Sequence, residues 1–351
     1  MSKVLLPLLL IFSIAIGTII LAPSFVENKG ITLQLPTPAP TLKPIPKSKT
    51  LPGGVQVFQT FNNCGPASLS MALSHYGVNV SQQVLGQQLR PYQNPAGDND
   101  DKSVTLEELA EKSKEYGFVP FHRPNGNSDL VKKFISYDIP VIVRTTTKPT
   151  EDIGHYRVIK GFDETAGVFI QDDSLQGKDL RYSFDDFNQM WQIFNYEYLV
   201  LIPPELEKTA ILILGQNADY NSSWQLAIQN SLQQLNSNPN DIYARFNLSV
   251  AYHNTGQYQA AVDEFEKVES QLSFRTLWYQ IEPIESYYKL GNYSRVFEIT
   301  DNILNNHNRA FSELYIIRGE IYKIQSQTDL ADAEFAKAIL YNQNLSLNSV
   351  N

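Results

Sequence analysis

The most reactive side chain in this 351-residue sequence is its single cysteine, Cys64. Small and apolar residues at helical spacing follow it, with Pro66 in the expected first turn and Gly77 as a stop signal. This pattern predicts a helix that begins close to Cys64. The N–H groups and the positive dipole at the start of a helix stabilise a thiolate, so Cys64 is a candidate nucleophile. The alternative is a small buried side chain, the commoner fate of a free cysteine.

The segment around this cysteine resembles the nucleophile segment of the bacteriocin-processing type of papain-like cysteine peptidases, especially their stand-alone relatives without a transporter. The similar residues here are Gln59 and the run Asn-Cys-Gly-Pro-Ala at 63–67. Residues 154–163, which include His155, resemble the histidine strand of that family. Residues 168–173 resemble its next strand, which ends in an aspartate. Together these elements form a fairly specific signature.

The resemblance implies a papain-like α+β fold and a set of catalytic residues. Cys64 would be the nucleophile, and His155 would take up its proton and later protonate the leaving amine. An aspartate would orient the imidazole and fix its tautomer. The family pattern favours Asp172 for this role. Asp173 stands where the family often has proline and is the alternative.

The same resemblance implies Gln59 as a donor to the oxyanion, beside the backbone N–H of Cys64. The family usually places this glutamine six residues before the nucleophile, whereas Gln59 lies five before it, and Gln56 is a poorer alternative. The resemblance spans roughly residues 55–203. We expect no cofactor and no metal, because one cysteine cannot build a multi-cysteine metal site and residues 97–101 depart from a calcium loop.

Local signals predict the elements that must position these residues. Thr105 and Glu108 form a capping box for a helix that ends near Gly117. Other expected helices run from Ser128 through Phe134 and from a Ser183 cap through Trp191, and expected strands cover residues 139–143, 155–162, 168–172 and 196–202. Helices that precede an antiparallel sheet indicate the α+β class over a domain at 53–205.

The first 52 residues differ in composition from the rest of the chain. Residues 4–22 are uncharged and mostly apolar, long enough to cross a bilayer, and Pro23 makes cleavage after Ala22 unfavourable. We therefore expect a membrane anchor within residues 1–25, with a cleaved signal segment as the alternative. The proline-rich residues 26–52 are expected to be an extended linker.

The C-terminal part, residues 207–345, contains a repeat. Tyr252, Gly256 and Tyr258 recur 35 residues later as Tyr287, Gly291 and Tyr293, and a third copy follows with Ser326 in place of the turn glycine. This period and turn chemistry resemble tetratricopeptide (TPR) repeats, which implies an all-α domain that binds a protein partner. A plain helical support for the enzyme is the alternative.

Composition limits the classes of function. The 28 Lys and Arg residues against 37 Asp and Glu give a net charge of −9, so nothing indicates a nucleic-acid partner. We expect a membrane-anchored, extracytoplasmic cysteine peptidase (secreted if the N-terminal segment is cleaved) that hydrolyses a peptide or protein substrate. The alternatives are an inactive peptidase-like scaffold or binding protein, and an acyl-transfer or amidase enzyme with the same site.

Overall fold

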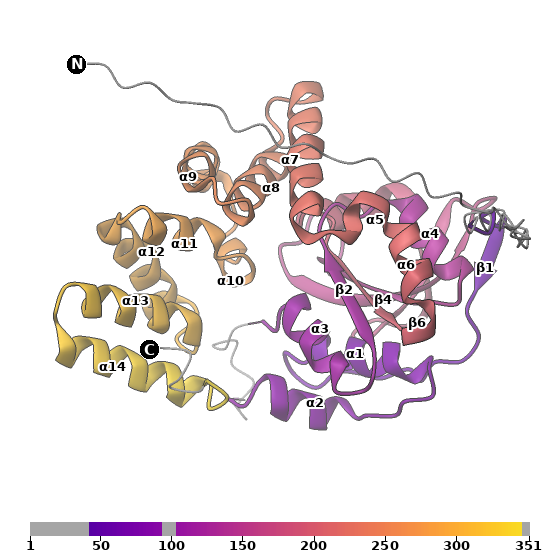
Figure 1. Ribbon diagram of the computed structural model, residues 1–351, viewed down its shortest axis with the longest axis horizontal. Coiled ribbons are helices and arrows are strands. Elements are labelled where there is room, and N and C mark those ends of the chain that lie inside the picture. The colour runs from indigo at the N-terminus through magenta and orange to yellow at the C-terminus, as the bar shows by residue number, and fades with distance from the viewer. Residues whose placement is uncertain (1–41, 93–102, 346–351) are drawn as a thin grey trace, which may run out of the picture. The chain divides into compact units, whose positions relative to one another are not determined.

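The structure is a computed structural model that describes residues 42–92 and 103–345 (Figure 1). The predicted anchor at 1–25 and most of the predicted linker lie outside these residues. Within the described ranges, no helix has the length and apolar character needed to cross a membrane.

The first part of the described chain is a seven-stranded antiparallel sheet with helices on both faces, which confirms the predicted α+β class (Figure 1). The strand order is β2-β7-β3-β4-β5-β6, and β1 pairs with the far end of β4. The strands are β1 (Ser48–Thr50), β2 (Val119–Arg123), β3 (Val141–Thr146), β4 (Gly154–Asp163), β5 (Val168–Asp173), β6 (Gly177–Ser183) and β7 (Tyr198–Ile202).

Helices cover the two faces of this sheet according to the alternation of its side chains. On β7, Leu199 and Leu201 pack with one set of helices, while Val200 and Ile202 pack with another. The first set is α1 (Cys64–Ser74), α2 (Gln82–Leu89) and α3 (Leu106–Lys114); the second is α4 (Ser128–Ser136), α5 (Phe184–Gln192) and α6 (Glu207–Leu214). Both faces of the sheet are therefore buried.

Most of the local signals are confirmed. α1 begins at Cys64, the capping box of Thr105 and Glu108 is complete, and Ser183 caps α5. The strands β1, β2 and β6 were not expected from the sequence. β1 belongs to the segment predicted as linker, yet Leu42 and Ile45 pack against the core and Leu51 is buried there. The globular part of the chain thus begins before residue 53.

The C-terminal part is helical, as predicted, and contains helix pairs at the predicted period. The second helices of three pairs begin at Tyr258, Tyr293 and Thr328, so that successive starts are 35 residues apart. The helices are α7 (Tyr220–Ser237), α8 (Ile242–Asn254), α9 (Tyr258–Glu266), α10 (Thr276–Tyr279), α11 (Glu282–Lys289), α12 (Tyr293–Asn306), α13 (Ser312–Ile324) and α14 (Thr328–Tyr341).

Buried polar contacts join the helical part to the sheet within the compact unit that starts at residue 42. Arg144 of β3 donates to the backbone oxygen of Tyr279 at 3.1 Å, and its guanidinium lies over the rings of Tyr156, Phe194 and Tyr279. Cation–π contacts of this kind are strongest when the cation is desolvated. The Arg144 side chain thus fixes α10 against the start of β4.

Candidate active site

Cys64 is the first residue of α1, and its neighbours hold that helix end in place. The Asn63 side chain donates to Gln82 at the start of α2, at 3.1 Å to both the backbone and side-chain oxygens. Arg90 donates to the Asn63 side-chain oxygen at 3.4 Å. A Cβ on Gly86 would lie 2.7 Å from the same oxygen, so only glycine admits this approach. The first turn of α1 and its N–H groups are thus fixed around the sulfur.

The Cys64 thiol hydrogen-bonds to His155 at the start of β4 and to the backbone of Tyr156. Burial by itself raises the pKa of Cys64, but the hydrogen bond and charge of His155, with a smaller effect of Arg90, outweigh it and lower that pKa. Burial alone would lower the pKa of His155, but bonds to Asp173 and Cys64 raise it to about 8. This arrangement favours a thiolate beside an imidazolium.

Asp173, at the end of β5, lies on the other side of the imidazole. Its Oδ1 is 2.9 Å from His155 Nε2 and also accepts from the backbone N–H groups of Leu175 and Gln176. Its Oδ2 accepts from Arg157 Nε at 2.8 Å. Burial raises the pKa of Asp173, but these partners, His155 foremost, bring it down to about 2. The carboxylate is therefore ionised, and both of its oxygens accept hydrogen bonds.

The expectation that Asp172 faces His155 is wrong in the structure. Asp172 instead pairs with the buried Lys160 at 2.6 Å and accepts from the backbone N–H of Asp179. The cause is strand register: β4 and β5 pair with Arg157 opposite Asp173, and side chains two apart on a strand share a face. Asp173 consequently shares the face of His155 and Arg157, and Asp172 lies on the other.

Sequence reasoning missed Arg157 as a member of this cluster, although the sequence held a signal for it. Arg157 is fully buried, and besides Asp173 it donates to Thr145, Thr146 and Thr147. An arginine two residues after the histidine on a buried strand needs a carboxylate on the same face. The signal lies in that requirement alone, because which of Asp172 and Asp173 meets it depends on the register between β4 and β5.

Gln59 is held near the end of β5. Its backbone N–H donates to the Ser174 backbone at 2.8 Å, and its side-chain oxygen accepts from the Ser174 hydroxyl at 2.7 Å. Gln56, the poorer alternative, donates to the backbone oxygen of Asp173 at 2.8 Å. The Gln59 amide is thus anchored beside the cluster by its oxygen, which leaves its Nε2 as the donor end.

The cluster can carry out acyl-transfer chemistry. A thiolate at a helix start is a nucleophile, an imidazolium bonded to it is a proton donor, and a carboxylate on the far ring nitrogen fixes the tautomer. Cys64, His155 and Asp173 have these three relations. Among the described residues, no group of three or more His, Cys, Asp and Glu side chains is arranged to hold a metal ion.

Comparison with known proteins identifies one family to which part of the chain is similar. Residues 45–199 match the family model described as the Peptidase_C39 like family, and they contain Cys64, His155 and Asp173. This part of the chain is therefore similar to C39 cysteine peptidases. A search of curated proteins gave no match.

Three solved structures are similar to part of the chain. A protein from Bacillus anthracis described as a C39-like peptidase has 16% identity and a TM-score of 0.37, and the match covers 45% of this chain and 98% of that one. The peptidase domain of Streptococcus ComA, a bifunctional ABC transporter involved in quorum sensing, has 24% identity and a TM-score of 0.34, with 42% and 97% covered. A double-glycine-motif protease from an AMS/PCAT transporter, in complex with its leader peptide, has 18% identity and a TM-score of 0.32, with 44% and 92% covered.

Proposed function

We propose that this protein is a cysteine peptidase that hydrolyses peptide bonds with Cys64 as nucleophile, His155 as general acid and base, and Asp173 as the residue that orients the imidazole. The observation that carries the proposal is the hydrogen-bonded series from the Cys64 thiol through His155 to Asp173 at the start of a helix. The match of residues 45–199 to the C39-like family supports it.

In the proposed reaction, the Cys64 thiolate attacks the carbonyl carbon of the scissile bond and a C–S bond forms. The His155 imidazolium gives its proton to the amide nitrogen, the C–N bond breaks, and the amine leaves. Neutral His155 then takes a proton from water, whose oxygen attacks the thioester carbon. The C–S bond breaks, and the thiolate–imidazolium pair is restored.

The negative charge on the substrate oxygen needs donors during both attacks. The backbone N–H of Cys64, in the first turn of α1, is one proposed donor, and Nε2 of Gln59 is the other. Ser174 supports the second assignment, because it holds the amide oxygen of Gln59 and leaves the nitrogen for the substrate. Gln59→Glu tests it: loss of the donor should slow acylation while the thiolate still reacts with iodoacetamide.

Labelling of the full chain with an electrophilic peptide probe tests the function. We expect one probe molecule per wild-type chain, no labelling of Cys64→Ala, and strongly reduced labelling of His155→Ala. Wild-type protein that reacts with iodoacetamide but with no peptide probe would favour an inactive scaffold. Labelling without hydrolysis of a peptide library, but with transfer to an added amine, would favour the acyl-transfer alternative.

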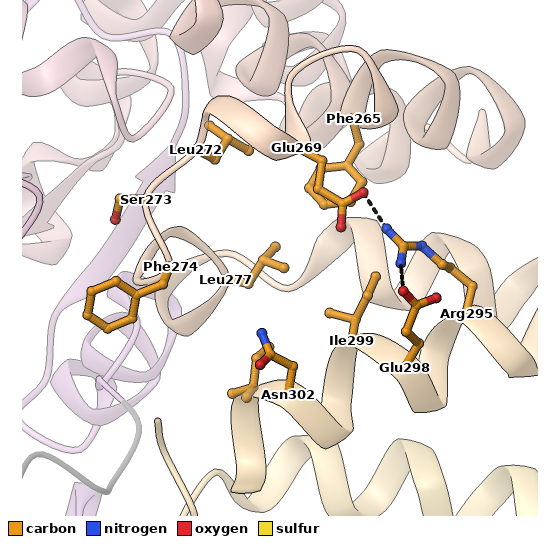
Figure 2. Close-up of a pocket in the computed structure, with 11 residues that line it drawn as sticks. Phe265, Glu269, Leu272, Ser273, Phe274, Leu277, Arg295, Glu298, Ile299 and Asn302 are labelled. Atoms are coloured by element: carbon orange, nitrogen blue, oxygen red, sulfur yellow. Dashed lines mark hydrogen bonds and ion pairs between the residues drawn. The ribbon is translucent and has the colours of Figure 1, made fainter. Parts of the chain in front are cut away.

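The helical part is proposed to bind a protein partner as TPR-like repeats. A cavity of about 270 Å³ between α9 and α12 supports this (Figure 2). Phe274 and Leu277 lie along one side of it and Ile299 along the other, and Phe274 is 48% exposed. Arg295 bonds to Glu269 and Glu298 at its edge. An exposed aromatic side chain beside a pocket with a mixed polar and apolar lining can serve as a binding anchor.

A photo-crosslinking amino acid at position 274 of the full chain tests partner binding. The same amino acid at position 340, where Leu340 is also exposed but lines no part of this cavity, is the matched control. Crosslinks specific to position 274 support the proposal, and identical patterns at the two positions contradict it.

We further propose that residues 4–22 tether the protein to a membrane outside the cytoplasm. Extraction of the full chain with carbonate and with detergent tests this proposal.

A further inference from the structure

A second cavity, of about 330 Å³, lies between the start of α3 and the helical part. The start of α3 forms one wall, and α10, α11 and α13 form the others. Tyr279 in this wall hydrogen-bonds to the backbone of Gly154, which directly precedes His155. The ring atoms of Tyr279 lie 3.0–3.1 Å from the position that a Cβ would take if Gly154 had one. A residue that lines the cavity thus contacts the backbone next to His155.

The opposite wall leads to the cysteine side of the site. Ser103 and Thr105 line the cavity. The Val104 side chain between them lies 3.4 Å from the position that a Cβ would take if Gly65 had one. Gly65 directly follows Cys64 in α1. A peptide bound across Cys64 and His155 would therefore have side chains within reach of this cavity.

The cavity is acidic. Glutamates from three helices line it, whereas no Lys, Arg or His does so among the described residues: Glu107 and Glu108 come from α3, Glu282 and Glu285 from α11, and Glu313 from α13. Burial, with a further effect of Glu285, raises the pKa of Glu282 to about 8, and the attraction of Arg144 is a smaller effect. A buried carboxyl held neutral in this way becomes ionised when a cation binds next to it.

Two buried groups in the wall have no hydrogen-bond partner within the described part of the chain. Glu282 Oε2 is a buried acceptor, and Nε1 of Trp278, a side chain only 6% exposed, is a buried donor. Leaving such groups unbonded is costly, so a ligand that bonds to both of them would be stabilised in this cavity. A peptide with a cationic side chain supplies both, because its ammonium or guanidinium donates to Glu282 and a backbone carbonyl accepts from Trp278.

We propose that this cavity is a subsite for a lysine or arginine side chain of the peptide substrate. Glu282 binds its charged end together with Glu285, whose Oε2 also lies 3.1 Å from His253 Nε2, and the rings of Trp278 and Tyr279 contact its methylene groups. Since Trp278, Tyr279 and both glutamates belong to the helical part, that part contributes directly to substrate specificity. This inference rests on the peptidase function proposed above.

Peptide epoxide probes that differ at one position test the subsite on the full chain. Each probe carries Lys, its uncharged counterpart norleucine, or Glu at one position and Ala at the others, and the rate of Cys64 labelling is measured. At one position we expect Lys to react about tenfold faster than norleucine, and Glu most slowly. In Glu282→Gln/Glu285→Gln protein this ratio should fall to about one, because the charged partners are gone.

The matched control is Glu111→Gln, which removes an exposed glutamate of α3 that pairs with Lys114 outside the cavity. It should keep the wild-type ratio. If the double variant is misfolded by circular dichroism, Glu285→Gln alone replaces it, since this carboxylate is 38% exposed. Equal rates for Lys and norleucine at every position would overturn the subsite and leave the peptidase function intact. No reaction with any peptide probe would overturn both.

Discussion

At the scale of single residues, Asp173 is the centre on which the site depends. It accepts from His155 and Arg157 and from the backbone N–H groups of Leu175 and Gln176. Four donors hold the carboxylate rigidly, so the imidazole that it binds is oriented before any substrate arrives. Arg157 acts on the imidazole through Asp173, because both side chains bond to the same carboxylate.

The two neighbouring aspartates should respond differently to the same substitution. Asp173→Asn should lower the rate of peptide-probe labelling on the order of a hundredfold, because an amide does not stabilise imidazolium and favours the wrong tautomer. Asp172→Asn should leave the rate near that of wild type. It should instead lower the free energy of unfolding by about 2 kcal/mol, since buried Lys160 loses one of its two carboxylates.

Labelling rates and urea unfolding curves for both variants measure these effects. Asp179→Asn is the matched control, because it removes the second, exposed partner of Lys160 at the same distance of 2.6 Å. A loss of labelling in Asp172→Asn with wild-type rates in Asp173→Asn would contradict the assignment. Equal rates in all three variants would show that Cys64 and His155 suffice without an acid.

The pH dependence of labelling by a peptide epoxide should report the two titrations of the thiol–imidazole pair. Ring opening needs a thiolate and a proton donor together, so the rate should fall above the pKa of His155, about 8. Asp173 raises this pKa, so removing its charge lowers it. The alkaline limb of Asp173→Asn should therefore lie at lower pH than that of wild type, and a limb that stays in place or moves upward would contradict the proposed orientation.

At the scale of elements, what could be predicted was local in sequence. The start of α1 at Cys64 and the Thr105 capping box depend on residues a few positions apart. The strand β1 has only three residues and gains its structure from a partner more than one hundred residues away. The choice between Asp172 and Asp173 likewise depends on the register of β4 with β5, which includes an irregularity between Ile159 and Gly161.

The turns of the helix pairs allow a test of the repeat at this scale. Gly256 and Gly291 have φ of 76° and 73°, and Ser326 adopts φ of 60° at the corresponding turn. A left-handed conformation costs a residue with a Cβ about 1–2 kcal/mol, while glycine is more flexible in the unfolded chain. Ser326→Gly should therefore raise the free energy of unfolding by about 0.5 kcal/mol.

The reverse change is the control for the turn. Gly256→Ser should lower the stability by a similar amount, because no atom lies within 4 Å of an added Cβ and only the backbone strain remains. Urea midpoints of the two variants and wild type give both values. A destabilised Ser326→Gly protein would mean that the serine side chain contributes more than its backbone strain costs.

At the scale of the whole molecule, the sheet and the helical part share buried contacts that a simple tether between two domains would not produce. Asn195 donates to the Asn247 backbone at 3.0 Å, and Asn247 donates back to Gln192 at 2.6 Å. Arg275 binds Asp152 through both carboxylate oxygens. The helical part therefore contributes to the stability around β4 as well as to the proposed subsite, and the domain boundary at 206 stays a prediction.

The N-terminal edge of the sheet gives the last prediction. Residues 48–50 pair with β4, the Leu51 N–H donates to the Lys160 carbonyl, and Lys49 binds Asp138, just after α4, at 2.8 Å. We expect a 42–351 protein to unfold at a higher urea concentration than a 51–351 protein. Its free energy of unfolding should be larger by about 2–4 kcal/mol, because the shorter protein loses the β1 pairing and the packing of Leu42 and Ile45. Gly161→Ala in the longer protein should reproduce part of this loss, because the added Cβ would lie 2.7 Å from the backbone oxygen of Lys49 and displace β1. Equal stability of the two lengths would show that residues 42–50 add nothing to the stability and would make β1 energetically neutral.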